Sequence, residues 1–356
     1  MKAAIVLGTR PEIIKLAPLI KQLAKKSTSV IFTGQHYDYN LSLRFIDQLG
    51  LAKPNHLMKI SHTKPTLQIA DVIRNLSKIL EKEKPDTVIV QGDTNTVLAA
   101  GIASLKSNIP VSHVEAGLRS YDWRMPEEHN RIEIDHISEL LFAPTTSTKY
   151  NLISEKVHGK IFVTGNTVID AINQFTKISR KHSKISVEDN DYVLMTLHRA
   201  ENVDKKEILS PIIKAVIDSK QDFIFPIHPR TLKRLHDFNL YTKLKRSKNM
   251  RILGPVGYFE ILELMKNCQF ILTDSGGIQE EATAPSIRKK VIVVRKTTDR
   301  PESVSTGFSE IAGTSYKGIL RAIKNNSKNP GVPSRKSPFG SGNTTKLIIK
   351  HLKANI

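Results

Sequence analysis

The chain has 356 residues, and its 54 lysines and arginines exceed its 34 acidic residues, so the formal net charge is +20. This length is too great for one ordinary core and predicts two domains of roughly 170 residues each. The single cysteine excludes an internal disulfide, no apolar run is long enough to span a bilayer, and no signal-peptide core follows Met1. We therefore expect a soluble, cytoplasmic protein that does not act at a membrane.

The basic charge favours anionic partners, because net charge influences molecular encounter and solubility rather than the fold. Nucleic acid is one possible partner of this kind. However, the basic residues are spread along helical faces and into the last third of the chain, as in Lys243–Lys248 and Arg288–Lys290. Aromatic residues for base stacking are few, and no nucleic-acid-binding module is recognisable. We therefore expect no nucleic-acid partner.

The first half of the chain alternates short apolar runs with amphipathic segments, a pattern typical of a parallel sheet covered by helices. The runs that predict its strands are AAIVLG, VIFTGQH, DTVIVQGD, VSHVEAG, LLFAPT and KIFVTGN. The pattern begins again in the second half with YVLMTLH, DFIFPIHP, MRILGP, FILTDSGG and KVIVVR. We predict an α/β fold of two doubly wound, Rossmann-like domains that face a cleft.

The predicted domain boundaries follow from changes in composition. The first domain is expected over residues 1–170 and the second over residues 171–335, with a polar join near Asp170 to Asp191. A passage rich in Ser, Lys, Asn and Pro, Lys324 to Ser341, is interpreted as a linker. It precedes a predicted helix at Thr344 to Ala354, so residues 336–356 are expected to pack back on the first domain.

Acidic residues gather in the stretch Gln91–Arg131. Asp93 and Glu115 each follow an apolar, β-branched run directly, and the segment between them is helical in pattern, which predicts two parallel strands and a crossover helix. Ligands of open parallel sheets bind beyond the carboxyl ends of the strands. These two acids, with Glu127 and Glu128 a short loop later, therefore indicate a reaction centre. The alternative is that they are helix caps and surface charges.

The segment GTRPEIIK places Arg10 after the first strand and Lys15 about one turn into the following helix. Both side chains could bind a phosphate or a sugar oxygen there. Pro11 fits the first helical turn, where its missing N–H would have no partner in any case. A structural alternative is a cap at a strand end for Arg10 and a solvated helix charge for Lys15.

The segment LTDSGGIQEEA predicts a strand that runs through small residues into a helix. Backbone N–H groups at such a helix start suit a diphosphate, and glycines allow a close approach, so Ser275, Gly276 and Gly277 are candidate phosphate ligands. Glu281, one turn later, could accept both hydroxyls of a ribose. The segment lacks the GK[ST] of a Walker loop and the GxGxxG of a dinucleotide fold. Glycines that only form a turn remain the alternative.

Three smaller groups follow predicted strands of the second half. His198 lies in LHRAEN, His228 in PIHPR and Arg300 in TTDRPES, and all three could contact a substrate. A lone histidine is more often a hydrogen-bonded structural residue, which is the alternative for His198 and for His228. None of the histidines has metal-ligand spacing, so we infer no metal site.

The motifs GTRPE, QGDT, HVEAGLR, PEExNR, TGNTVIDA, HRxEN, DSGGIQEE and TxxRPE occur in this order over nearly the whole chain. In this the sequence resembles the non-hydrolysing UDP-N-acetylglucosamine 2-epimerase family. The resemblance implies a glycosyltransferase B fold, a homodimer, and interconversion of UDP-N-acetylglucosamine and UDP-N-acetylmannosamine without a cofactor. It implies acid/base and sugar-site roles for Asp93, Glu115, Glu127 and His198. It implies sugar and phosphate contacts for Arg10 and Lys15, and UDP contacts for Ser275, Gly276, Gly277, Glu281 and Arg300.

The family's chemistry needs acid/base groups on two sides of the sugar ring and cations for the leaving diphosphate. The sequence supplies both kinds of group but does not say which acid serves which face. Tyr37–Ser42 stands where similar bacterial members often carry a Gln-containing segment associated with an allosteric substrate site, so the resemblance does not extend to substrate activation of that type. A hydrolysing epimerase, a UDP-sugar glycosyltransferase and a non-catalytic sugar-nucleotide-binding protein remain alternatives.

Overall fold

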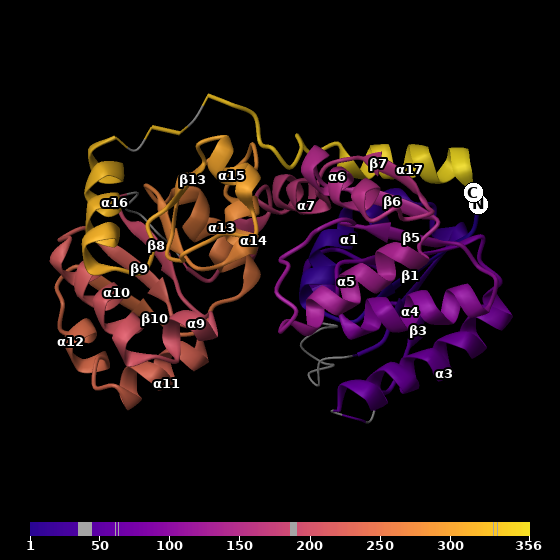
Figure 1. Ribbon diagram of the computed structural model, residues 1–356, viewed down its shortest axis with the longest axis horizontal. Helices are drawn as coiled ribbons and strands as arrows, with labels where there is room; N and C mark the ends of the chain where they lie inside the picture. The colour runs from indigo at the N-terminus through magenta and orange to yellow at the C-terminus, as the bar shows by residue number, and fades with distance from the viewer. Residues whose placement is uncertain (35–44, 61, 63, 186–190, 330, 333) are drawn as a thin grey trace. The chain divides into compact units, whose positions relative to one another are not determined.

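The computed structural model describes residues 1–34, 45–60, 62, 64–185, 191–329, 331–332 and 334–356. The chain forms two compact units (Figure 1). Unit 1 comprises Met1–Ala171 together with Phe339–Ile356, and unit 2 comprises Ile172–Pro338. Tyr37–Ser42, to which the expectation about substrate activation refers, lies outside the described residues. No described helix is both long and apolar enough to cross a bilayer.

Unit 1 is built on a parallel sheet in which the described strands have the order β3-β2-β1-β4-β5-β6-β7. Its strands are β1 (Ala3–Leu7), β2 (Thr28–Phe32), β3 (His56–Leu57), β4 (Thr87–Gln91), β5 (Val111–Val114), β6 (Leu140–Ala143) and β7 (Lys160–Val163). The chain runs outward from β1 to β3 and then crosses back to β4. The direction of winding therefore reverses between β1 and β4, and ligands of such sheets bind at this switch point.

Helices cover both faces of this sheet. They are α1 (Arg10–Gln22), α3 (Pro65–Glu83), α4 (Asn95–Lys106), α5 (Pro126–Ile137), α6 (Thr146–Ser154) and α17 (Thr344–Asn355), with a short 3-10 turn, η1 (Lys25–Ser27). The boundary between the two units falls within α7 (Thr167–Phe175). Helices α3, α4 and α5 pack side by side on one face, and α1 lies with α17 on the other (Figure 1). Fully buried Val6, Val90 and Leu76 are typical of the core between sheet and helices.

Helix α17 is held within unit 1 at both ends. The backbone N–H groups of Thr344 and Thr345 donate to the carboxylate of Asp170, at 3.1 and 3.0 Å, so this buried acid caps the helix start. Near the other end, the rings of His351 and Phe162 stack with centroids 4.0 Å apart.

Unit 2 repeats the same architecture, with its described parallel strands in the order β10-β9-β8-β11-β12-β13. These strands are β8 (Val193–Thr196), β9 (Phe223–Pro226), β10 (Met250–Leu253), β11 (Ile271–Thr273), β12 (Val291–Val293) and β13 (Ser309–Ile311). The switch point of this sheet lies between β8 and β11. The two doubly wound sheets predicted from the sequence are thus confirmed, although the short strands β3 and β13 were not predicted.

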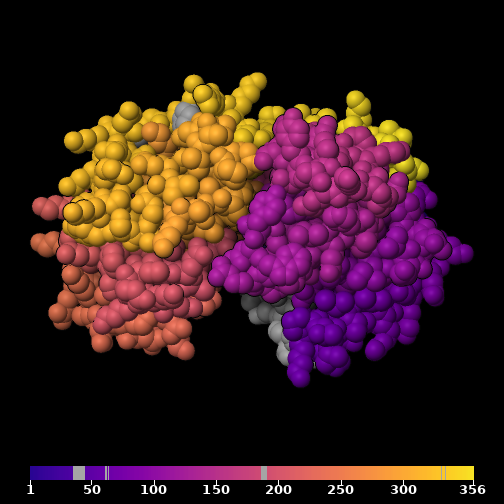
Figure 2. Space-filling view, in the orientation of Figure 1, coloured from indigo at the N-terminus to yellow at the C-terminus, as the bar shows by residue number. Residues whose placement is uncertain are grey.

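The helices of unit 2 are α8 (Ser179–His182), α9 (Ala200–Val203), α10 (Lys206–Asp218), α11 (Pro229–Asp237), α12 (Tyr241–Lys245), α13 (Tyr258–Asn267), α14 (Gly276–Glu281), α15 (Pro301–Ser305) and α16 (Tyr316–Lys328). Helices α10 and α16 pack together. In the space-filling view the later part of the unit, in orange to yellow, lies above its earlier part, in salmon (Figure 2). The prediction that the linker begins at Lys324 is wrong, because α16 continues to Lys328. Ile319, Ile323 and Asn326 are buried at helical spacing, and that packing extends the helix.

Candidate active site

The switch point of unit 1 is formed by the turn after β1 and the loop after β4. A Cβ atom at Gly8 would lie 2.4 Å from the hydroxyl oxygens of Thr33 and Thr96, so only glycine fits at the start of the turn. Glu12 accepts hydrogen bonds from the backbone N–H groups of Gly8, at 2.5 Å, and Thr9, at 3.1 Å. Its other carboxylate oxygen accepts from the hydroxyl of Thr94 at 2.6 Å. Glu12 thus links the turn after β1 to the loop after β4, the two segments that form the switch point.

The Glu12 side chain is almost completely buried. Burial raises its pKa to about 7, although the hydrogen bonds from Thr94, Gly8 and Thr9 favour the ionised carboxylate. The sequence analysis did not single out this residue. Its place in the GTRPE motif, three residues after a helix cap, is the sequence signal that was available.

Glu115 directly follows β5 and has a left-handed backbone conformation, with φ at +72°. Residues other than glycine adopt it at a cost of about 1–3 kcal/mol and often at functional sites. The ammonium of Lys15 lies 2.8 and 2.6 Å from the two carboxylate oxygens of Glu115. The amide of Gln91 donates to one of them at 2.7 Å. The structure therefore brings together two predicted site residues, Lys15 and Glu115, in a largely buried ion pair.

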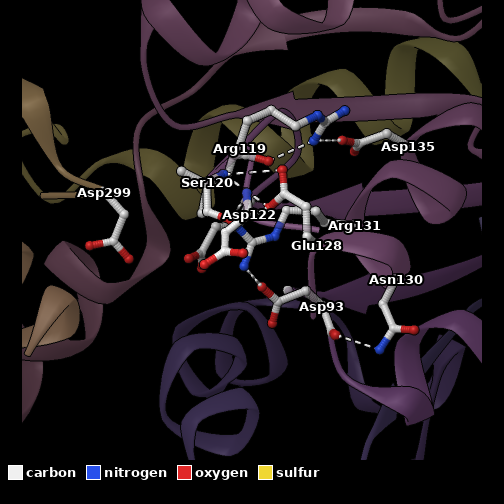
Figure 3. A network of polar contacts seen from close by, with 12 residues as sticks. Asp93, Arg119, Ser120, Asp122, Glu128, Asn130, Arg131, Asp135 and Asp299 are labelled. Carbon is white, nitrogen blue, oxygen red and sulfur yellow. Dashed lines mark hydrogen bonds and ion pairs between the residues drawn. The ribbon is translucent and has the colours of Figure 1, made fainter. Parts of the chain in front are cut away.

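Asp93 lies two residues beyond β4, and its carboxylate accepts a 2.5 Å hydrogen bond from the guanidinium of Arg131. The same guanidinium forms an ion pair with Glu128 at 3.1 Å, so Arg131 lies between the two acids (Figure 3). The side-chain amide of Asn130 donates to the backbone carbonyl of Asp93 at 2.9 Å. Arg131 was missed in the sequence analysis, although it is the arginine of the PEExNR motif.

The two adjacent glutamates at the start of α5 have opposite environments. Glu127 is exposed to solvent, whereas Glu128 is completely buried. Arg10, another predicted site residue, is also exposed, and its guanidinium carbon lies 5.3 Å from the centroid of the Phe45 ring. No hydrogen bond among the described residues joins Glu127 or Arg10 to Asp93 or Glu115.

A buried polar network supports the strand ends beneath these acids. His113 contacts the carbonyl oxygen of Gly92 through Nε2, at 2.8 Å, and the carboxylate of Asp135 through Nδ1, at 2.7 Å. The other oxygen of Asp135 accepts from the N–H of Gly117 at 3.1 Å and from Arg119 at 2.7 Å (Figure 3). The loops after β4 and β5 are therefore fixed by a satisfied network rather than by apolar packing alone.

In unit 2 the switch point brings His198, after β8, to Asp274, after β11. The Asp274 carboxylate accepts from the backbone N–H groups of His198 and Arg199, at 3.1 and 2.9 Å, and from the amide of Asn202 at 3.2 Å. Nδ1 of His198 lies 3.2 Å from the same carboxylate. Burial opposes ionisation of Asp274, but contact with His198 and the backbone donors keeps its pKa below the usual range.

A cavity of about 260 Å³ opens beside His198 at the carboxyl ends of β8 and β9. His228 lines it as well, with the two imidazole centroids 5.8 Å apart. Burial, together with the positive charges of His198 and Arg230, lowers the pKa of His228. The remaining wall is mostly apolar and includes Val256 and Ile278. Such a wall, with a few polar groups, suits one end of an organic ligand.

The DSGG segment starts α14 as predicted. The hydroxyl of Ser275 accepts from the N–H of Ile278 at 3.5 Å and caps the helix. A Cβ atom at Gly276 would lie 3.0 Å from the Asp299 carboxylate, whereas one at Gly277 would have no contact closer than 3.8 Å. A side chain at Gly276 would therefore be crowded by the carboxylate of Asp299, whereas Gly277 has more space.

Arg300 and Glu281 flank this segment. The guanidinium of Arg300 donates to Glu280 at 2.5 Å and to the backbone carbonyl of Asp299 at 2.9 Å. Burial opposes ionisation of Asp299, but nearby arginines, Arg300 first, lower its pKa to about 2. Glu281 is half-buried at the end of α14. Within the described part of the chain, no cluster of three or more His, Cys, Asp or Glu side chains is arranged to hold a metal ion.

A sequence profile of the UDP-N-acetylglucosamine 2-epimerase family matches residues 20–353. The chain belongs to this family. Its members are epimerases, a class of isomerases, and the chain is an enzyme of this class. The family predicted from the ordered motifs is thereby confirmed.

Relatives from both archaea and bacteria match the chain over almost its whole length. The UDP-N-acetylglucosamine 2-epimerase of Methanocaldococcus jannaschii is 45% identical over 99% of both chains. Its crystal structure in complex with UDP-GlcNAc and UDP superposes with a TM-score of 0.86 and full coverage of both chains. The UDP-GlcNAc-bound epimerase of Neisseria meningitidis gives 0.87 at 34% identity, again with full coverage. The Pseudomonas aeruginosa UDP-2,3-diacetamido-2,3-dideoxy-D-glucuronate 2-epimerase is 32% identical over 99% of both chains.

Proposed function

We propose that this epimerase interconverts UDP-N-acetylglucosamine and UDP-N-acetylmannosamine by elimination of UDP and its re-addition. The observation that carries the proposal is the pair of carboxylates, Asp93 and Glu115, at the ends of the adjacent strands β4 and β5, each in contact with a cation. Relatives that match the chain in full have been crystallised with UDP-GlcNAc, which supports the choice of substrate.

The chemistry follows from the substrate. The C2 proton lies beside an acetamido group and has no adjacent carbonyl to acidify it, so its removal is easier if the C1–oxygen bond to UDP breaks at the same time. A carboxylate takes the proton, UDP leaves with the bonding electron pair, and a C1–C2 double bond forms. UDP then adds back at C1 while a proton reaches C2 on the opposite face.

Unit 1 is proposed to supply the acid/base groups. Glu115, which accepts hydrogen bonds from Lys15 and Gln91, is one proton-transfer candidate. Asp93 and Glu127 are the other proton-transfer candidates. Arg10 and Lys15 are proposed to bind oxygens of the sugar or the phosphates.

Unit 2 is proposed to bind the nucleotide. Ser275, Gly276, Gly277, Glu281 and Arg300 are its proposed UDP contacts, as the family motifs imply. The cavity beside His198 and His228 is of a suitable size and apolar character for part of the uridine. His198 is further proposed to act on the leaving diphosphate, a role that suits an imidazole oriented by a buried carboxylate.

The wider setting is part of the same proposal. We expect a cytoplasmic homodimer that needs no redox cofactor and supplies an activated sugar for cell-surface polysaccharides. UDP-sugars with other substituents are a second substrate class, because the Pseudomonas aeruginosa relative is named for a UDP-diacetamido-glucuronate. Gel filtration with light scattering tests the dimer directly.

The deciding experiment is incubation with UDP-N-acetylglucosamine followed by chromatographic separation of the products. A mixture of the two UDP-sugars that is also reached from UDP-N-acetylmannosamine supports the proposal. Release of UDP and free N-acetylmannosamine would instead identify a hydrolysing epimerase, and transfer to an added acceptor would identify a glycosyltransferase. Saturable binding without any product would leave only a sugar-nucleotide-binding protein.

A further inference from the structure

The loop between β5 and α5 has an unusual combination of backbone strain and exposed aromatic rings. Tyr121 lies in the left-handed region, with φ at +55°, which is unfavourable for an aromatic residue. Its side chain is 75% exposed, and that of Trp123 is 65% exposed. The strained conformation of Tyr121 therefore cannot be attributed to burial of its own ring. Some other contact holds residues 120–125 in place.

At Ser120 and Tyr121 this contact is the buried carboxylate of Glu128, while the imidazole of His129 contacts the carbonyl oxygen of Trp123 at 2.8 Å. The Glu128 carboxylate accepts from the N–H of Ser120 at 2.9 Å, the hydroxyl of Ser120 at 2.7 Å and the N–H of Tyr121 at 2.9 Å. Burial opposes ionisation, but these donors and Arg131 keep the pKa of Glu128 below its usual range. An acid surrounded by donors is a poor proton shuttle, because protonation would break several bonds at once.

The same carboxylate also determines the environment of a proposed catalytic acid. One terminal nitrogen of Arg131 contacts Glu128 at 3.1 Å, and the other donates to Asp93 at 2.5 Å. Figure 3 shows the guanidinium between the two acids. Because a guanidinium is planar and rigid, its position toward Glu128 fixes the direction in which it meets Asp93.

We propose that Glu128 is a positioning residue that sets the carboxylate of Asp93 through Arg131 and couples it to the conformation of residues 120–125. The kinetic part of this proposal rests on the proposed function. In this arrangement the strain at Tyr121 is maintained by the same acid that orients the catalytic pair. A change in the loop is therefore transmitted to Asp93 without any contact between the loop and the sugar.

The first test compares Glu128→Gln with Glu133→Gln. Glu133 lies on the same helix and is exposed, so its substitution is a matched control for the loss of one charge. We expect Glu128→Gln to lower kcat by roughly 10- to 100-fold, since a displacement of about 1 Å can have an effect of this size, with a much smaller change in KM. Glu133→Gln should behave as the wild type. A kcat of folded Glu128→Gln within threefold of wild type would overturn the proposal.

A double-mutant cycle separates positioning from general stabilisation of the fold. If Glu128 acts through Asp93, the substitution should have little further effect on kcat once Asp93→Asn is present. Equal fold-losses in the two backgrounds would show independent action and refute the coupling. Should Glu128→Gln not fold, Ser120→Ala replaces it in the cycle, because it removes one donor to Glu128 and only a small side-chain atom. Its expected effect is a smaller loss of kcat in the same direction, and an unchanged kcat would refute the proposal.

The second test needs no substrate. Trp123 is the only tryptophan of the chain, and its ring centroid lies 4.3 Å from that of His129, so in the folded protein its emission reports on the environment of residues 120–125 and His129. We expect Glu128→Gln to change the emission of the folded protein and Glu133→Gln to leave it unchanged. Identical spectra would refute the control of the loop by Glu128, even if the enzyme proved to use another substrate. Absence of epimerisation by the wild type would instead contradict the proposed function.

Discussion

Glu12 provides a quantitative prediction, because its buried carboxyl has a clear isosteric replacement. In Glu12→Gln the amide carbonyl can accept from the N–H groups of Gly8 and Thr9, while the amide nitrogen donates to the hydroxyl oxygen of Thr94. The variant therefore keeps the contacts at the switch point and loses only the ability to ionise.

The magnitude follows from the raised pKa of Glu12. A rise from 4.5 to about 7 corresponds to about 3 kcal/mol between the two protonation states. Because the folded value lies above the unfolded one, the stability contributed by Glu12 is fully present below pH 4.5 and is lost as the pH rises through about 7. The free energy of unfolding of Glu12→Gln should therefore increase relative to the wild type by about 2–3 kcal/mol from pH 5 to pH 8.

The assay is urea unfolding at several pH values, followed by the emission of Trp123, which belongs to the same unit as Glu12. Glu133→Gln serves as the control, because that carboxylate is exposed and its loss should not create such a pH-dependent difference. A difference between Glu12→Gln and wild type that stays constant from pH 5 to pH 8 would refute the reasoning. It would mean that the three donors outweigh burial and that Glu12 is ionised throughout.

The proposed chemistry leads to further predictions. Asp93→Asn, Glu115→Gln and Glu127→Gln should each lower turnover by roughly two to four decades without unfolding the protein, and near-normal turnover would remove that residue from the acid/base set. In D2O, the early UDP-N-acetylmannosamine should carry deuterium at C2, and mass spectrometry showing full retention of protium would exclude elimination with solvent exchange. Gly8→Ala should lower the free energy of unfolding by about 1–3 kcal/mol, measured in urea, because its Cβ meets two hydroxyl groups.

The sequence predicted those parts of the site that depend on strand periodicity. Asp93 and Glu115 follow strands β4 and β5 closely, so the parallel pairing of the strands is enough to bring both acids to one edge. The sequence could not show which of Glu127 and Glu128 is buried. The segment before Pro126 is irregular, so the sequence does not determine which face of α5 each residue lies on. Once the helix start is known, Glu128, Arg131 and Asp135 fall on one buried face at helical spacing.

Other features were missed because their cause is tertiary. Strands β3 and β13 are only two and three residues long and lie at sheet edges, where no long apolar run marks them. The contact of Lys15 with Glu115 joins residues 100 positions apart, and neither local motif indicates a partner. The end of α16 was placed too early, since the composition of its last turn is that of a linker while its packing is that of a helix.

Both units have a buried carboxylate at the switch point of the sheet, but the pKa values of the two carboxylates shift in opposite directions. At each switch point a buried carboxylate accepts the backbone N–H groups of the turn after the first strand, Glu12 in unit 1 and Asp274 in unit 2. Glu12 faces only uncharged donors, so burial dominates and its pKa rises. Asp274 also contacts the imidazole of His198, which offsets burial and lowers its pKa. Asp274 lies 3.2 Å from Nδ1 of His198 and orients this imidazole, which we propose acts on the leaving diphosphate. The strand order around the switch point is the same in both units, so the different partner of the buried acid, and not the topology, accounts for the opposite pKa shifts.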